Sequence, residues 1–243
     1  MNVQTAMLTA QGGRDYNEDY CGSVELEDES KCWVVADGLG GHGGGDVASK
    51  LAVEAMLNTL AENPVLATGT LNLQFNKAQA AVLEGQKRSL KLADMHTTAV
   101  VLVIHHELAL WGHIGDTRLY YFHEGRLQKQ TSDHSVPQLL ANAGEIDVSE
   151  IRFHEDRNRL LRSIGSEAAF KPHLEQSPIS LHSGDAFLLC TDGFWEYVFE
   201  AEMAEDLQQA SSAAQWLKAM ELRLLARAPE RNDNYSAIAI TVF

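Results

Sequence analysis

The sequence has few cysteines and no long apolar run, and both features exclude classes of protein. The three cysteines, Cys21, Cys32 and Cys190, are an odd number without CxxC spacing. This pattern argues against a disulfide framework and against a cysteine zinc site. No apolar stretch approaches the roughly 20 residues that a membrane-spanning helix requires. The first residues lack a basic segment followed by an apolar core, so no signal peptide is expected. These features predict a cytoplasmic protein.

Positive charge is also scarce, with 19 Lys and Arg against 34 Asp and Glu, a net charge of -15. So acidic a surface repels nucleic-acid backbones and anionic lipids, which argues against nucleic-acid partners and against roles at a membrane surface. Membrane insertion is not expected either, because no apolar run is long enough. The 243 residues are 45% hydrophobic, enough for one sizeable core. Because the apolar segments are evenly spread without a linker, we expect one domain spanning residues 1–243. We also expect the protein to be a monomer.

Short apolar runs predict strands. Three segments with helical periodicity lie between these runs or follow them. The predicted strands are residues 33–36, 98–104, 108–114, 118–122, 186–190 and 235–242. Some runs are continuously apolar, which indicates strands covered on both faces, and short polar turns between them favour antiparallel pairing. Apolar residues at helical spacing occur in 47–60, 71–82 and 217–224, the last with Ser211 or Ser212 as N-cap. The order predicts an α+β fold with central sheets and outer helices.

Residues 134–165 form a polar segment without strand runs that contains four arginines. They are Arg152, Arg157, Arg159 and Arg162. A solvated helix or loop is the simpler interpretation. The alternative is a mobile, flap-like lid that meets an anionic substrate.

The glycine cluster at residues 38–45 contains GLGGHG, a loose match to the dinucleotide-binding pattern GxGxxG. That fingerprint also requires an acidic residue at the end of a second strand about 20 residues further on. A predicted helix fills this space instead, so we reject a dinucleotide site.

Acidic residues recur at the edges of the apolar strands. They are Glu18, Asp19, Asp37, Asp116, Asp192 and Asp233. Asp-Gly after a strand, as at Asp37 and Asp192, is by itself an ordinary turn signal. If these strand ends meet, however, the crowded carboxylates repel one another unless cations neutralise them. Oxygen ligands favour Mg²⁺ or Mn²⁺, and a pair of such ions can activate water to attack a phosphoryl group.

Seven segments, in order, resemble the motifs of the PPM/PP2C family of serine/threonine phosphatases. They are RDYNED, VVADGLGGHGGG, TTAVV, GDTRLYYF, TSDH, LLCTDGFW and NDNYSAIAI, which extend from Arg14 to Ile240. The short form is similar to the bacterial branch. The resemblance implies two packed antiparallel sheets flanked by helices, with a metal centre at one end. It also implies hydrolysis of phosphoserine and phosphothreonine by a metal-bridging hydroxide.

The resemblance further implies which residues bind the two core ions. Asp37 would bridge both ions. The Gly38 carbonyl and Glu18 would complete the ligands of the second ion, and Asp192 and Asp233 would bind the first.

Three more residues receive roles from the resemblance. Asp19 would orient metal-bound water, Asp116 would help to bind a third, weaker ion, and Arg14 would bind the substrate phosphate. A guanidinium suits phosphate because its planar fork can donate to two oxygens. The alternatives are a turn-capping role for Asp116 and, for Arg14, a surface ion pair with Asp15 or Glu18.

One position departs from the eukaryotic pattern, which places a histidine directly after the Asp-Gly. Here that residue is Leu39, and the nearest histidine is His42, so the acid that protonates the leaving group is unassigned. An inactive phosphoprotein-binding module of the same fold is the main alternative function, and a two-metal nuclease is a third. Expected partners are phosphorylated substrates of a serine/threonine kinase. The DGFWEYV segment is similar to forms associated with type VI secretion control.

Overall fold

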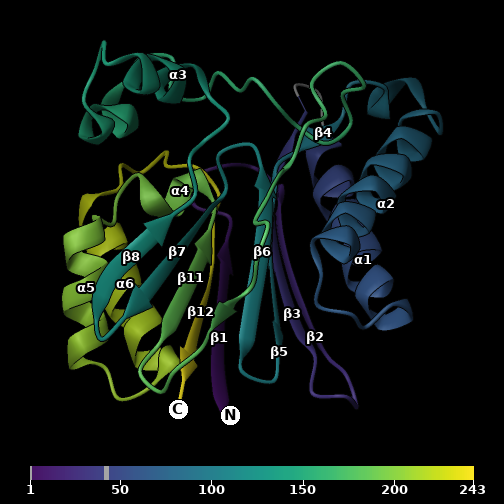
Figure 1. The fold of residues 1–243 in the computed structure, drawn as a ribbon. Helices are drawn as coiled ribbons and strands as arrows, with labels where there is room; N and C mark the ends of the chain where they lie inside the picture. The colour runs from purple at the N-terminus through teal and green to yellow at the C-terminus, as the bar shows by residue number, and fades with distance from the viewer. Residues whose placement is uncertain (1, 41–43) are drawn as a thin grey trace.

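The computed structural model describes residues 2–40 and 44–243, so His42 lies outside the described residues. Within them, two antiparallel sheets pack face to face (Figure 1). The first sheet has the order β1 (Val3–Ala10), β12 (Tyr235–Val242), β11 (Ala186–Cys190), β7 (Arg118–His123) and β8 (Arg126–Gln130). The second has the order β10 (Ile179–Ser180), β6 (Leu108–Ile114), β5 (Ala99–His105), β3 (Lys31–Leu39) and β2 (Asp19–Glu25), while β4 (His96–Thr97) pairs with β3 and β9 (His173–Leu174) with β6.

The continuously apolar strands are apolar because both of their faces are buried. In β3, Trp33 and Val35 belong to the cluster that fills the space between the two sheets. The alternate residues Cys32 and Val34 belong to a different cluster, under the outer helices. Since side chains of a strand alternate between faces, two cores require an unbroken apolar run. The prediction of doubly covered strands is confirmed here.

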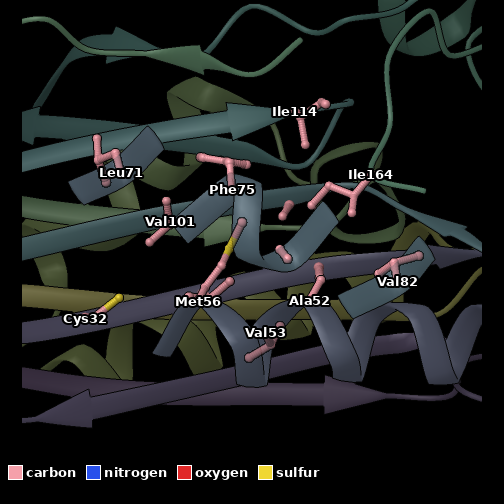
Figure 2. Packing of buried hydrophobic residues seen from close by; sticks show 14 of the residues in the cluster. Cys32, Ala52, Val53, Met56, Leu71, Phe75, Val82, Val101, Ile114 and Ile164 are labelled. Atoms are coloured by element: carbon pink, nitrogen blue, oxygen red, sulfur yellow. The ribbon is translucent and has the colours of Figure 1, made fainter. Parts of the chain in front are cut away.

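Two long helices cover the outer face of the second sheet, α1 (Gly45–Glu62) and α2 (Thr68–Gln86). Figure 2 shows Met56 of α1 and Phe75 of α2 packed over Val101 of β5. The short helix α4 (Asp192–Trp195), α5 (Glu200–Gln209) and α6 (Ala213–Arg227) cover the first sheet, and Ser212 caps α6 by accepting from the Gln215 N–H. The predicted α+β fold with central sheets and outer helices is confirmed. None of the described helices is long and apolar enough to cross a membrane.

The strands that sequence analysis missed are edge or half-exposed strands. β8 reads RLQKQ and is mostly exposed, and β1 alternates between partly buried and exposed residues. Neither has an apolar run, because each needs to bury only one side. α5 was missed because its sequence EAEMAEDLQQ contains only two apolar residues larger than alanine.

The segment 134–165 contains α3 (Val136–Ala143) and a 3₁₀ helix, η2 (Val148–Phe153). Figure 1 shows it above α4, at the end of the sandwich opposite the two termini. The solvated interpretation is wrong for Arg152, which is buried and bonds to the carboxylate of Glu200 at 2.6 Å through Nη2. A buried guanidinium needs such a partner, and the partner lies outside the segment.

Candidate metal centre

The predicted carboxylates meet because each lies where a strand begins or ends at the same rim of the sandwich. Asp19 opens β2 and is paired in register with Asp37 near the end of β3. Asp116 lies in the turn between β6 and β7, Asp192 follows β11, and Asp233 precedes β12. Antiparallel neighbours bring a strand end next to a strand start, so residues distant in sequence converge here.

An open cavity of about 710 Å³ lies at this rim. Its lining includes Arg14, Glu18, Asp37, Gly38, Asp116, Asp192 and Asp233. Thus every residue predicted to bind metal or phosphate faces the same space. Asp19 is buried beside it, as the cross-strand partner of Asp37.

The Asp37-Gly38 backbone is fixed from both sides. The Asp37 carbonyl accepts hydrogen bonds from Thr97 Oγ1 at 2.7 Å and from the Thr98 N–H at 2.9 Å. The Gly38 N–H donates to the Glu18 carbonyl at 3.1 Å. A Cβ at position 38 would lie 2.0 Å from the Gly45 carbonyl oxygen, so only glycine fits. The Asp-Gly pair is therefore more than a turn signal, because the glycine permits close approach of the α1 start.

Two of the buried carboxylates have an oxygen without any partner among the described residues. Asp19 accepts a hydrogen bond from Thr191 Oγ1 through Oδ2 at 2.9 Å, but its Oδ1 is buried and unpaired. Asp116 is buried, and its Oδ1 is likewise unpaired. A buried polar atom without a partner is costly, so each oxygen needs a ligand. The turn-capping role considered for Asp116 does not account for its Oδ1.

The cluster is electrostatically strained. Burial, followed by the charges of Asp192 and Asp19, raises the pKa of Asp37 well above the usual aspartate value. Burial and the charge of Asp116 do the same to the pKa of Asp192. Burial raises the pKa of Asp19 to about 7, and burial together with the charge of Asp133 raises the pKa of Asp116 to about 7. Removing these groups from water and crowding like charges both disfavour the ionised forms.

These residues fit a pair of hard divalent cations. The candidate ligands that line the cavity offer only oxygen donors, which suits Mg²⁺ or Mn²⁺ rather than zinc. Among the described residues, no three of these carboxylates bring ligand oxygens within 4.8 Å of one another. Their mutual repulsion favours this spread, and bound cations would draw the carboxylates inward.

Arg14 lies at the mouth of the cavity and pairs with a different acid from the one expected. Its Nη2 lies 2.5 Å from Asp233 Oδ2, whereas the sequence suggested Asp15 or Glu18 as the ion-pair partner. More than half of the Arg14 side chain is exposed. The guanidinium can therefore turn from Asp233 toward a ligand in the cavity.

Sequence analysis missed the residues that position the ligands. Asn234 accepts from the Glu18 N–H through Oδ1 and donates to the carbonyls of Gln11 and Tyr16 through Nδ2. Ser49 of α1 donates to the Glu18 carbonyl at 2.6 Å. The NDN segment was a visible signal for Asn234, since an amide next to a ligand carboxylate can bond to backbone. Ser49 had no such signal, because its role depends on how α1 packs.

Residues 134–165, the predicted flap, contribute to one side of the cavity. Asn158 and Leu160 belong to the lining. Nearby, Arg157 Nε donates to Glu196 Oε1 at 2.6 Å, just after α4. The carboxylate of Glu196 in turn helps to raise the pKa of Asp192. A cationic side chain of the flap thus pairs with an acid beside the carboxylate cluster.

Comparison with known proteins finds relatives that are described as phosphatases, together with a regulatory component of similar fold. Residues 11–234 match the family model described as "Protein phosphatase 2C". A serine/threonine phosphatase stp from Listeria innocua is 32% identical over 200 residues, covering 80% of this chain and 79% of the relative. The catalytic domain of the phosphatase PstP, solved in complex with two manganese ions, is 25% identical with a TM-score of 0.82, covering 99% of this chain and 98% of that one. PppA, described as a key regulatory component of T6SS in Pseudomonas aeruginosa, is 26% identical with a TM-score of 0.77, covering 100% and 99%.

Proposed function

The chain belongs to the protein phosphatase 2C family, and we infer that it is a protein serine/threonine phosphatase that hydrolyses phosphoserine and phosphothreonine. The observation that supports catalysis most directly is the convergence of five of the predicted acidic side chains on one open cavity, where Asp116 Oδ1 has no partner among the described residues. An inactive binding module would have no use for strained, unpartnered acids. A nuclease is disfavoured because the net charge of -15 repels a nucleic-acid backbone.

We propose that Glu18, Asp37, Asp192, Asp233 and the Gly38 carbonyl bind two Mg²⁺ or Mn²⁺ ions. When bound, such a pair supplies an activated water and neutralises charge on the phosphoryl group. Arg14 binds the phosphate oxygens after its guanidinium leaves Asp233. The Oδ2 of Asp233 is then free to serve as a metal ligand. The manganese pair in the PstP structure supports divalent ions in this family.

Asp19 is proposed to orient the attacking water. Its Oδ1 is buried and free to accept a hydrogen bond, while Thr191 Oγ1 fixes Oδ2 at 2.9 Å. Leu39 lines the cavity where eukaryotic relatives place a histidine, so this position supplies no proton to the leaving group. We expect the rate to depend on the acidity of the leaving group more steeply than in an enzyme with a general acid.

Asp116 is proposed to bind a third, weaker ion. Its Oδ1 is unpaired, while its backbone carbonyl accepts from Trp195 Nε1 at 3.0 Å, which fixes the turn independently of the side chain. Asp116→Ala should therefore leave the thermal midpoint nearly unchanged, lower kcat at least tenfold and retain two tightly bound ions. Full activity with a lowered midpoint would instead assign Asp116 to the turn. Calorimetric metal stoichiometry, kcat and Tm together decide between these outcomes.

The substrates are proposed to be phosphoproteins modified by a serine/threonine kinase, bound by a monomeric single domain whose residues 134–165 act as a flap. The link to type VI secretion stays a prediction. PppA is 26% identical to the chain and PstP 25%, so identity does not distinguish the two pathways. Phosphoproteomics of a deletion strain would identify the substrates.

The experiment that tests the proposed activity uses p-nitrophenyl phosphate and a phosphothreonine peptide. With Mn²⁺ we expect turnover of both, abolished by EDTA and restored by excess Mn²⁺. Phosphopeptide binding without turnover in Mn²⁺ and in Mg²⁺ would contradict the enzyme and support the binding module.

A further inference from the structure

A second cluster of metal-binding side chains lies at the opposite rim of the sandwich. It consists of His123 at the end of β7, with His182 and Asp185 just before β11. The same two strands connect the two rims, because β7 follows Asp116 and β11 precedes Asp192. The cluster is thus one strand length away from the carboxylates of the cavity, and Asp185 is hydrogen-bonded to Val242 near the C-terminus.

The ligand atoms of the three side chains already converge. One donor atom from each lies within 4.8 Å of the others, and this is the only such group of His, Cys, Asp and Glu among the described residues. His123 Nδ1 lies 2.6 Å from Asp185 Oδ1, and His182 Nδ1 lies 4.0 Å from Asp185 Oδ2. Tetrahedral zinc, bound at about 2.0–2.2 Å, requires ligand atoms about 3.5 Å apart. Only small side-chain rotations are needed to reach that spacing.

Asp185 is held as a preorganised ligand. Its side chain is fully buried, and its Oδ2 accepts a hydrogen bond from the backbone N–H of His182 at 2.8 Å. Its backbone carbonyl accepts from the Val242 N–H at 2.9 Å, and the Gly184 N–H donates to the Val242 carbonyl at 2.9 Å. Such supporting bonds fix a ligand's orientation before the ion arrives. The two imidazoles, by contrast, are partly exposed at His123 and mostly exposed at His182, so an ion can enter from solvent.

We propose that His123, His182 and Asp185 form a second metal site, selective for zinc-class divalent ions, that links β7 to the turn before β11. Two imidazoles and one carboxylate suit Zn²⁺, whereas the oxygen-only cavity suits Mg²⁺ or Mn²⁺. The argument against zinc from cysteine spacing does not apply, because no cysteine takes part. Three protein ligands leave the fourth zinc position to water.

The alternative is that His123 and Asp185 form only a hydrogen-bonded pair. The Asp185 carboxylate raises the pKa of His123 above its usual value, mainly through this bond. Such a pair accounts for two of the residues. It leaves His182 without a role, although its ring lies edge-on to that of His123 with centroids 5.6 Å apart.

The test is a Zn²⁺ titration by calorimetry, with saturating Mg²⁺ in the catalytic cavity, on the wild type and on His182→Asn and His123→Asn. The matched control is His106→Asn, which removes another exposed histidine lying 3.5 Å from a carboxylate, that of Glu29. We expect the wild type and the control to bind one more zinc ion than the two site variants. At a hundredfold excess over Kd, zinc should raise Tm by about 5–10 °C only in the first two proteins.

Because the His182 side chain is mostly exposed, His182→Asn should keep the metal-free Tm and the Mg²⁺-dependent phosphatase activity of the wild type. It therefore decides the question even if His123→Asn is unstable. Equal zinc stoichiometry and affinity in all four proteins, or no zinc binding in the wild type, would overturn the proposal.

Discussion

The two rims of the sandwich place buried carboxylates in opposite circumstances. At one rim, Asp19 and Asp116 each have a buried oxygen that no described residue partners. At the other, Asp185 is buried to the same degree, yet it bonds to His123 through Oδ1 and to a backbone N–H through Oδ2. The first arrangement costs folding free energy, and the second stabilises the fold.

The difference indicates where the chain accepts instability for function. Acids that have an oxygen unpaired among the described residues lie at the rim with the open cavity, where bound cations would compensate for the missing partners. A third case, in the interior, shows that satisfied pairs are available to this fold. Arg118 donates to both oxygens of Asp133, at 2.8 and 2.7 Å, and both residues are buried.

Replacing the central acid of each rim should give opposite effects, and this is the largest effect we expect. Asp37→Asn should lower kcat by about 10³-fold or more, because it removes the proposed bridging ligand. It should also raise the Tm of the metal-free protein, since it relieves repulsion with Asp192 and Asp19. Asp185→Asn should instead lower stability by about 1–3 kcal/mol and leave kcat unchanged. Both are measured by thermal unfolding in EDTA and by turnover in Mn²⁺.

Destabilisation of the metal-free protein by Asp37→Asn would contradict this comparison. It would mean that Asp37 supports the fold through its side chain rather than straining it. Asn keeps the shape of Asp, so a cavity cannot explain such a result.

Arg14 should give the next largest effect. Arg14→Ala should lower kcat/KM by about 10–150-fold, mainly through KM, because a charge-assisted contact contributes about 1.5–3 kcal/mol. Arg14→Lys is the matched control, which keeps the charge but loses the planar fork, so only partial recovery is expected. If kcat/KM is unchanged in both variants, Arg14 is merely the ion-pair partner of Asp233.

The pH dependence of stability should also separate the rims. Asp19 and Asp116 have a folded pKa of about 7, above their ordinary value of 3.8. Between these values the folded state binds more protons than the unfolded state, so metal-free stability falls as pH rises toward 7. Saturating Mn²⁺ should flatten this slope, because nearby cations then keep both carboxylates ionised in the folded state. Urea unfolding at pH 5, 6 and 7, in EDTA and in Mn²⁺, measures the slope of stability against pH.

His123 supplies the contrast in that experiment. Its folded pKa is raised above 6.5 by Asp185, so its contribution is complete below 6.5 and is lost as pH rises through the folded value. This loss of stability occurs at higher pH than the loss from Asp19 and Asp116. Mn²⁺ bound at the carboxylate rim should leave the His123 contribution unchanged. A slope between pH 5 and 7 that Mn²⁺ does not alter would contradict the assignment of the carboxylates as ligands.

The sequence predicted the fold most reliably where burial is two-sided. The bounds of β6, β11 and β12 agree residue for residue with the apolar runs, because both faces of these strands are covered. The sequence pattern did not predict β1 and β8, because their polar residues face solvent. The sequence showed that these acids stand at strand ends, with an Asp-Gly pair at Asp37 and Asp192, but their roles as ligands came from the resemblance to the family and stay a prediction.

Other features of the site could not be predicted, because they depend on contacts distant in sequence. Ser49 and Thr191 bond to the site through the packing of α1 and of β11 against β12. The ion pair between Arg14 and Asp233 joins residues 219 positions apart. The four arginines of residues 134–165 had a visible pattern, but the structure buries one, leaves two half-buried and exposes only Arg159.

The smallest effect that we expect concerns Arg157 and Arg159, which differ in exposure. Arg157 pairs with Glu196 beside the carboxylate cluster, whereas Arg159 is exposed. Arg157→Ala should loosen the flap, because it removes a partly exposed ion pair contributing about 0.2–1 kcal/mol, and leaves Glu196 unpaired near Asp192. Turnover of p-nitrophenyl phosphate and of a phosphothreonine peptide should then fall alike, by about 2–5-fold.

Arg159→Ala removes no such pair and should affect only the peptide, whose flanking residues reach the flap while the small substrate does not. The ratio of kcat/KM for the two substrates therefore separates the two arginines. It should stay constant in Arg157→Ala and fall about 2–5-fold in Arg159→Ala, the scale of one exposed ionic contact. A constant ratio in both variants would mean that the flap binds no part of the peptide, and that its arginines serve only to hold it over the acidic rim.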